Sequence, residues 1–303
     1  MTTRVLVTGA TGFTGSYVVP LLLRRDYRVR CLVRTTSKTD ALKGTEADLV
    51  FGDLEDLASL TNALRGVDVL VNIASLGFGH APNIVGAAVA AGVRRGIFVS
   101  TTAVKTTLNA ASKSVRLAAE HTIRQSGLAS TILRPTMIYG ARRDRNMCRL
   151  INHLNRWPII PVFGDGQHLQ QPVYVGDVAA AVVQSLESHA AIGETYNISG
   201  GAVVTYNELI DAVCSLLRRK VYKIHIPAMP VVVALRALER ISLRLPITSE
   251  QIQRLNEDKA FDHHDATRDF GYAPMTLVQG LSRELEDMGL ARGLDVEATR
   301  NVL

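Results

Sequence analysis

Three glycines near the N-terminus carry the first chemical signal in the sequence. Gly9, Gly12 and Gly15 have the spacing G-x-x-G-x-x-G, directly after the apolar run RVLVTG and before an apolar stretch of helical period. Glycine permits a tight turn, and backbone amides at the start of a helix can meet a pyrophosphate with the positive end of the helix dipole. The pattern predicts a dinucleotide-binding turn. The alternative is a turn that merely packs a strand on a helix.

Two further residues bear on which nucleotide the turn receives. Arg34 ends the second apolar run, about twenty residues beyond the turn, where an acidic residue would pair with the ribose hydroxyls of NAD. An arginine there suits a 2′-phosphate, so we expect NADP(H) to be preferred over NAD(H), with Lys38 adding charge. A solvated surface arginine is the alternative. Asp53 could accept a hydrogen bond from the adenine amino group or cap the helix that follows it.

Strands and helices alternate through the first part of the chain. Short apolar, β-branched runs predict strands, and the stretches between them have helical periodicity. This alternation is typical of an α/β fold of the Rossmann type, a doubly wound parallel sheet covered by helices on both faces. The expected strands are 4–9, 27–34, 47–53, 67–74, 95–101 and 129–136, and the expected helices are 16–25, 57–64, 83–91 and 112–126.

The alternation breaks after Gly140, where loops rich in Arg, Pro and Gly lead into a mostly helical pattern. We expect residues 1–140, with 176–199 returning to them, to form the dinucleotide-binding domain. Residues 141–175 and 200–303 then form a smaller, mainly helical C-terminal substrate lobe.

The amino-acid composition limits the classes of binding partner and the cellular compartment that we expect. The chain has 303 residues, 47% of them hydrophobic, and a net charge of +6 with basic residues scattered among 28 acidic ones. This charge indicates anionic small molecules or a membrane face at least as readily as nucleic acid, and we expect no nucleic-acid partner. Three widely spaced cysteines argue against a disulfide framework and for the cytoplasm. We expect no metal site, since neither an i,i+4 histidine pair nor Cys-x-x-Cys occurs, and we expect no secretion signal or membrane span.

Taken together, these motifs resemble the short-chain dehydrogenase/reductase superfamily in its extended or atypical branch, close to NAD-dependent epimerase/dehydratases and NmrA-like proteins. VTGATGFTG is similar to the cofactor loop, GDLEDLASL to the adenine segment, VLVNIAS and IFVSTT to the fourth and fifth strands, and GLASTILRPTMIYG to the sixth. Beside the three glycines, Arg34 and Asp53, the resemblance implies that the cofactor is lined by Thr11, Phe13, Leu54, Ala74, Ser75, Ser100, Thr101, Arg116, Pro135, Met137 and Ile138.

The sequence departs from this family where hydride chemistry is organised. The family's working pair is Tyr-x-x-x-Lys, but no tyrosine here has a lysine four residues on, and alignment by Glu120 puts Ser112 and Arg116 at those positions. The two lie one helical turn apart, but an alkyl hydroxyl is a far weaker acid than a phenol with its pKa of about 10. Arg116 can still fork onto ribose hydroxyls. Thr102 matches the family's hydroxyl that holds the substrate oxygen, or else caps backbone.

The second lobe supplies the remaining candidates. Tyr139, Arg142 and Arg143 open it, and we expect them on the substrate side, where the arginines could hold a diphosphate or simply form a solvated basic loop. Residues 230–246 place Arg236, Arg240 and Arg244 one turn apart. Such a helix could lie on an anionic membrane, contact a lipid-linked substrate, or only cover the lobe.

Two classes of function stay open. The first is an atypical NADP(H)-dependent oxidoreductase or epimerase that acts on a small carbonyl or hydroxyl substrate, such as a nucleotide sugar, without the Tyr–Lys pair. The second is a non-catalytic, NmrA-like redox sensor or accessory subunit that binds NADPH. The complete second lobe and its arginine-rich loop favour the enzyme, as a monomer or homodimer, whereas the missing acid favours the sensor.

Overall fold

A computed structural model describes residues 2–108, 111–240 and 248–291. The contacts divide the chain into two compact units. The first consists of Met1–Ile138, Val175–Ser199 and Asp262–Pro274, and the second of Tyr139–Tyr174, Gly200–Phe261 and Met275–Leu303.

The first unit is built on a parallel sheet of seven strands in the order β11-β6-β5-β4-β1-β2-β3. The six expected strands are present within one or two residues, which confirms the predicted doubly wound α/β fold. The strands are β1 Arg4–Thr8, β2 Arg28–Val33, β3 Asp48–Phe51, β4 Val69–Asn72, β5 Arg95–Val99, β6 Ala129–Pro135 and β11 Thr195–Ile198.

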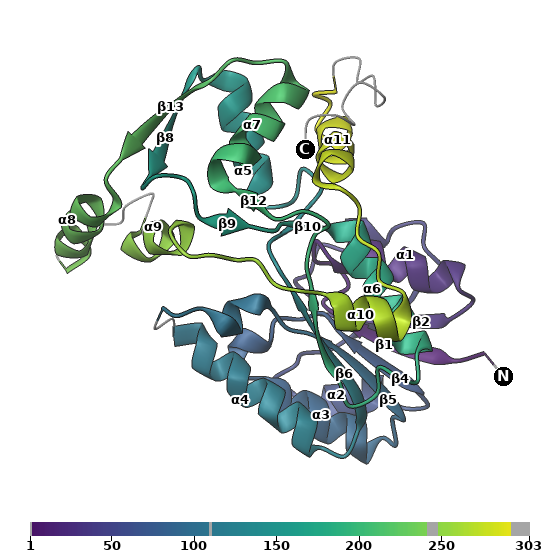
Figure 1. The fold of residues 1–303 in the computed structure, drawn as a ribbon. Helices are drawn as coiled ribbons and strands as arrows, with labels where there is room; N and C mark the ends of the chain where they lie inside the picture. The colour runs from purple at the N-terminus through teal and green to yellow at the C-terminus, as the bar shows by residue number, and fades with distance from the viewer. Residues whose placement is uncertain (1, 109–110, 241–247, 292–303) are drawn as a thin grey trace. The chain divides into compact units, whose positions relative to one another are not determined.

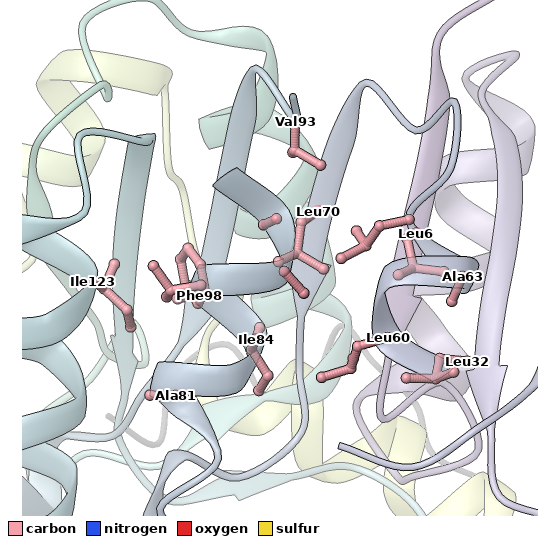
Figure 2. Close-up of a cluster of buried hydrophobic side chains, with 14 of the residues drawn as sticks. Leu6, Leu32, Leu60, Ala63, Leu70, Ala81, Ile84, Val93, Phe98 and Ile123 are labelled. Atoms are coloured by element: carbon pink, nitrogen blue, oxygen red, sulfur yellow. The ribbon is translucent and has the colours of Figure 1, made fainter. Parts of the chain in front are cut away.

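Helices cover both faces of this sheet, because its central strands are apolar on both sides. On one face, side chains of α2, α3 and α4 pack on the strands around Leu6, Leu70 and Phe98 (Figure 2). On the other face, α1 packs along α6. The helices are α1 Gly15–Arg24, α2 Leu57–Ala63, α3 Ala81–Ala90, α4 Ala111–Gln125, α6 Val175–Glu187 and α10 His264–Phe270, with 3-10 turns η1 Asp40–Leu42, η2 Leu76–Phe78 and η3 Thr102–Lys105.

The segment Asp262–Pro274 belongs to the first unit, whereas the sequence assigned it to the substrate lobe. Its side chains explain the difference. The Tyr272 hydroxyl donates to the carbonyl oxygen of Ser199 at 2.9 Å, and the Tyr196 hydroxyl donates to Asp269 at 2.7 Å. These bonds tie the segment to the end of β11, which no local pattern in the sequence could reveal.

The second unit is mainly helical, with short strands (Figure 1). Three of its helices begin with a threonine in a capping box, which satisfies amides at the helix start. Arg244 and the other residues of 241–247 lie outside the described part of the chain. The elements are β7 Ile138–Tyr139 at its border, α5 Met147–Arg156, β8 Ile159–Phe163, β9 Leu169–Gln170, β10 Val173–Tyr174, β12 Val204–Thr205, α7 Tyr206–Leu217, β13 Tyr222–Ile226, α8 Ala228–Arg240, α9 Ser249–Leu255 and α11 Leu277–Asp287.

A fully buried acid on α11 makes the second unit sensitive to pH. Burial raises the pKa of Glu284 to about 10, and the neighbouring carboxylate of Asp144 adds to the effect. Glu284 is therefore protonated in the folded chain at neutral pH, while in an unfolded chain it ionises near its ordinary pKa of about 4.3.

We predict that Glu284→Gln stabilises the protein more at pH 8 than at pH 5. The folded-state pKa is raised, so the stability that protonated Glu284 contributes is fully present below the unfolded pKa and is lost as pH rises toward the folded pKa. Glutamine cannot ionise and avoids this loss. Urea titrations should show a gain in unfolding free energy that grows by about 1–3 kcal/mol between the two pH values. Exposed Glu286→Gln on the same helix is the control, and equal pH slopes for both variants would contradict the prediction.

Candidate cofactor site

The predicted cofactor residues come from segments at the carboxyl ends of parallel strands. In an open α/β sheet these ends meet along one edge, where ligands bind. The segments are Gly9, Thr11, Gly12, Phe13 and Gly15 after β1, Arg34 after β2, Asp53 and Leu54 after β3, Ala74 and Ser75 after β4, Ser100 and Thr101 after β5, and Pro135, Met137 and Ile138 at and beyond the end of β6.

The glycine turn is tight because backbone segments approach one another closely. Gly9 has a φ of +71°, and the amide of Gly12 donates to its carbonyl oxygen at 3.0 Å. A Cβ on Gly9 would lie 2.7 Å from the amide nitrogen of Ala74, and a Cβ on Gly15 would lie 2.3 Å from the Gly9 carbonyl oxygen. Only glycine fits at these two positions without moving backbone.

Helix α1 presents its first turn at this loop. Thr14, at its N-cap position, makes no side-chain capping bond within the described residues, and Gly12 is exposed. Amides at an uncapped helix start are donors for an anion, and the helix dipole favours negative charge there. The turn therefore fits a nucleotide diphosphate.

A buried polar pair joins β1 to β4 beneath the turn. Thr8 donates from its hydroxyl to Asn72 Oδ1 at 2.7 Å, and Asn72 Nδ2 donates to the carbonyl oxygen of Ala74 at 3.0 Å. These bonds fix the segment after β4 against Gly9. The sequence analysis missed Asn72, whose signal was a polar residue closing the otherwise apolar run VLVN.

The segments that would select the nucleotide lie after β2 and β3. The Arg34 side chain is exposed, and the backbone amide of Arg34 donates to Ser37 Oγ at 3.2 Å. Asp53 accepts from the Glu55 amide at 3.0 Å, while Asp56 accepts from the Ala58 amide at 2.9 Å. Asp56, and not Asp53, therefore caps α2, so the capping alternative for Asp53 is wrong.

Helix α4 brings the replaced family pair against the segment after β4. Arg116 donates to Ser112 Oγ at 2.6 Å. Its guanidinium carbon lies 3.2 Å from where a Cβ on Gly77 would stand, so it packs on η2, the turn that Ser75 caps. The fold thus places Ser112 and Arg116 of α4 close to the turn that follows Ala74 and Ser75.

The end of β5 is ordered by hydroxyl groups. Thr101 accepts from the Ala103 amide at 3.2 Å and so caps η3. Thr102 is buried, and its hydroxyl donates to the Pro135 carbonyl oxygen at 3.3 Å. This contact matches the backbone-capping alternative that the sequence left open for Thr102.

Glu120 is the buried anion of this site, although the sequence analysis used it only for alignment. It accepts from Ser100 Oγ at 2.7 Å, from Arg134 Nε at 3.0 Å and from Arg124 at 2.9 Å. Burial raises its pKa, but hydrogen bonds from Arg134 and Ser100 and the charges of both arginines outweigh burial and hold the pKa below its usual value. Glu120 therefore stays ionised and fixes the rotamer of Ser100.

Lys105, at the end of η3, is a second residue that the sequence analysis missed. Lys105 is exposed, but the protein atoms around it lower its pKa by partial desolvation, and the charge of Arg134 lowers the pKa further, while Glu120 acts in the opposite direction. A lysine with a lowered pKa beside this network is a candidate for holding a proton. Its signal in the sequence was its position three residues after Thr102.

The predicted substrate residues lie in the second unit. Tyr139 is buried, and its hydroxyl donates to the Leu277 carbonyl oxygen at 3.4 Å. Arg142 and Arg143 are both exposed, and Arg142 donates from its amide to Asp287 and from its guanidinium to the Met288 carbonyl oxygen, each at 2.8 Å. Tyr139 and Arg142 thus bind the loop to α11. A substrate role for the three stays a prediction.

Comparison with known proteins identifies what kind of site this is. A family model described as NAD(P)H-binding matches residues 9–189. The chain belongs to this NAD(P)H-binding family. Its relatives and structural neighbours include NAD-dependent epimerases and dehydratases of the extended short-chain dehydrogenase/reductase group, which confirms the resemblance. A nicotinamide cofactor is therefore supported, without a distinction between NAD and NADP.

Three curated relatives differ in their named functions. The chain is 25% identical to the N-acetyl-alpha-D-glucosaminyl-diphospho-ditrans,octacis-undecaprenol 4-epimerase of Escherichia coli O157:H7, over 94% of this chain and 95% of that one. It is 30% identical to quinone oxidoreductase 2 of Escherichia coli strain K12, over 68% and 71%. It is 26% identical to the Arabidopsis thaliana mitochondrial NADH dehydrogenase [ubiquinone] 1 alpha subcomplex subunit 9, over 84% and 68%.

Among solved structures, the fold is similar to that of UDP-glucose 4-epimerase from Thermotoga maritima in complex with UDP-glucose. The TM-score is 0.74 at 20% identity, over 94% of this chain and 98% of that one. At this identity the likeness establishes the fold.

We predict that Gly15→Ala weakens NADPH binding by about tenfold or more, equivalent to about 1.4 kcal/mol. Its Cβ meets two backbone carbonyl oxygens, of Gly9 and Ala10, so the turn must open and its amides lose their alignment. Gly86→Ala, within α3, is the matched control because nothing lies within 4 Å of its added Cβ. Fluorescence titration with NADPH, with circular dichroism to verify folding, measures both. Equal dissociation constants for the two variants would contradict the assignment of the turn.

Proposed function

We propose that this protein binds NADP(H) in preference to NAD(H) and is an oxidoreductase or epimerase of a small carbonyl or hydroxyl substrate, of the nucleotide-sugar kind, that works without a Tyr–Lys pair. The proposal rests on one observation. The backbone of Gly9 packs against Ala74 at the head of α1, and Arg116 packs against the turn that follows Ala74. The phosphate-binding turn and a ribose-binding cation thus share one edge of the sheet.

We assign cofactor binding, substrate orientation and proton transfer to different side chains of the protein. When bound, a nicotinamide supplies or accepts the hydride. Arg116, always charged and forked, is assigned to the ribose hydroxyls. Ser112 accepts a hydrogen bond from Arg116 and can only orient a substrate oxygen, because a serine hydroxyl does not ionise near neutral pH. Lys105 is the candidate proton donor.

The relatives support this choice of chemistry. One is named an epimerase of a diphosphate-linked sugar and matches almost the full length of this chain, and another is named a quinone oxidoreductase. The exposed Arg143 at the start of the second unit suits an anionic substrate group. A sugar diphosphate is therefore the first substrate class to test, followed by quinones.

A second candidate function is NADPH binding without turnover, in an accessory subunit or redox sensor. The observation that favours it is the Ser112–Arg116 hydrogen bond. The two residues that replace the family's Tyr and Lys are bonded to each other. The Arabidopsis relative, named as a subunit of NADH dehydrogenase, is consistent with such a role.

The cysteines support the proposed compartment. All three cysteines are free, buried thiols, which suits the cytoplasm that we propose as the compartment. We propose a monomer or homodimer acting on small molecules, with no nucleic-acid partner.

Arg34→Asp should weaken NADPH binding by about tenfold or more and leave NADH binding unchanged or improved. The guanidinium is proposed to pair with the 2′-phosphate, and a carboxylate there repels that phosphate but accepts from ribose hydroxyls. Calorimetric titration with both nucleotides measures the ratio. Arg28→Asp, at the exposed amino end of the same strand, is the control for charge alone. Equal losses for both nucleotides would refute the assignment of Arg34.

Ser112→Ala should leave turnover within a few-fold of the original, whereas Lys105→Met should lower it about a hundredfold, the low end of general acid–base catalysis. Arg116→Ala should instead weaken NADPH binding. Absorbance changes of NADPH and NADP with sugar diphosphates, keto sugars and quinones provide the assay. A hundredfold loss in Ser112→Ala would overturn its assignment. Tight NADPH binding with no turnover on any substrate would favour the accessory function.

A further inference from the structure

One face of the two-stranded sheet in the second unit is apolar and exposed. Strands β8 and β13 run parallel, with Tyr222 beside Ile159 and Ile224 beside Pro161. Paired residues of parallel strands project to the same side, so alternate positions form one surface, which we call the outer face. It comprises Ile159, Pro161, Phe163, Tyr222, Ile224 and Ile226, of which Ile159, Tyr222 and Ile224 are between 46% and 61% exposed.

The opposite face of this sheet makes contacts within the unit. Ile160 and Val162 are buried. Lys223 donates to Asp211 of α7 at 2.7 Å, and the His225 ring lies 3.3 Å from the Asn207 side chain of the same helix. The sheet therefore packs one face on α7 and turns the other outward, where a sheet ordinarily carries polar residues.

Segments that adjoin this sheet in the chain also carry exposed apolar side chains. Trp157, two residues before β8, is 53% exposed, and α8 follows β13 after Pro227 alone (Figure 1). Met229 and Val233, one turn apart on α8, are 69% and 61% exposed. Isolated exposed apolar residues are normal, but a series along consecutive elements indicates an interaction surface.

Positive charge accompanies the aromatic residues of this surface. The Arg156 guanidinium lies 5.5 Å from the centre of the Trp157 ring, and the Lys220 ammonium lies 5.7 Å from the centre of the Tyr222 ring. Arg218 and Arg219, also exposed, precede Lys220 in the chain. Each exposed aromatic side chain of the surface is thus paired with a cation, an apolar ring beside a charged group.

We propose that the outer face, with Trp157, Met229 and Val233, docks on the surface of an anionic phospholipid bilayer. Tryptophan and tyrosine favour the boundary between acyl chains and headgroups, and nearby Lys and Arg are attracted to anionic lipids. A second copy of this chain fits less well, since a two-fold contact through this face would bring its cations together. No helix in the described ranges is long and apolar enough to span a bilayer.

The proposed contact lies mainly on β8 and β13, and it includes only Val233 of the segment 230–246 for which the sequence suggested a membrane contact. In the structure Arg236 is exposed and donates to Gln253 of α9 at 3.2 Å. The cations of the proposed contact are instead Arg156 and Lys220, and its apolar groups lie mainly on β8 and β13.

Trp157 allows a direct test, because it is the only tryptophan in the chain. The full-length protein is mixed with vesicles of pure phosphatidylcholine or of phosphatidylcholine with phosphatidylglycerol in equal parts, and its emission and sedimentation are recorded. We expect a blue shift and co-sedimentation with the anionic vesicles alone, both reduced by salt. Unchanged emission and no co-sedimentation with anionic vesicles would overturn the proposal.

Matched variants assign the contact to this face. Ile224→Ser and Lys220→Glu should each lower the vesicle partition coefficient about tenfold or more. Val203→Ser, exposed in the same unit but off the face, and Arg24→Glu, exposed on α1, should not. Equal partitioning of all four variants would refute the assignment. So would a dimer in analytical ultracentrifugation that Ile224→Ser dissociates, because a second copy would then be the occupant. NADPH titration of each variant verifies folding and is independent of the proposed surface.

Discussion

The first unit depends on the close approach of two backbone segments, at Gly9 after β1 and Ala74 after β4. The approach requires the absence of a side chain at Gly9, and the buried Thr8–Asn72 bond holds the two strand ends in register. Because β1 and β4 are neighbours whose connections leave in opposite directions, this contact marks the point where the sheet opens for a ligand. The direction of α1 and the position of η2, on which Arg116 packs, both follow from it.

The parts of this arrangement that sequence could predict are those specified locally. Buried parallel strands are continuous apolar runs, and a glycine turn has a fixed spacing, so the six strands and the turn were found within one or two residues. The roles of Glu120 and Tyr139 could not be found this way. Glu120 accepts hydrogen bonds from Ser100 and Arg134, which are twenty and fourteen residues away in the chain. Tyr139 donates a hydrogen bond to Leu277, 138 residues away. Such partners become neighbours only after folding.

The loss of the family's tyrosine need not disturb cofactor binding, because cofactor binding and proton transfer depend on different contacts. A buried carboxylate is costly unless it is paired, and Glu120 meets this condition through two arginines and a serine. That network orders Ser100 at the end of β5 without any contribution from Ser112. The Ser112–Arg116 bond joins the two substituted positions within α4 and supplies no acid comparable to a phenol. A chain can therefore keep the nucleotide while its proton chemistry changes.

Net charge alone could not distinguish among an anionic substrate, a membrane and nucleic acid, because it says nothing of what each cation already contacts. In the second unit Arg142 and Arg236 are exposed, and each donates a guanidinium hydrogen bond to a group of its own unit. Arg156 and Lys220 instead lie over exposed aromatic rings, which bind a cation through the ring face and leave its polar hydrogens able to meet an outside anion. The positive charge that we propose to act on a partner is therefore the part that lies beside exposed apolar side chains, which in this unit are those of β8 and β13.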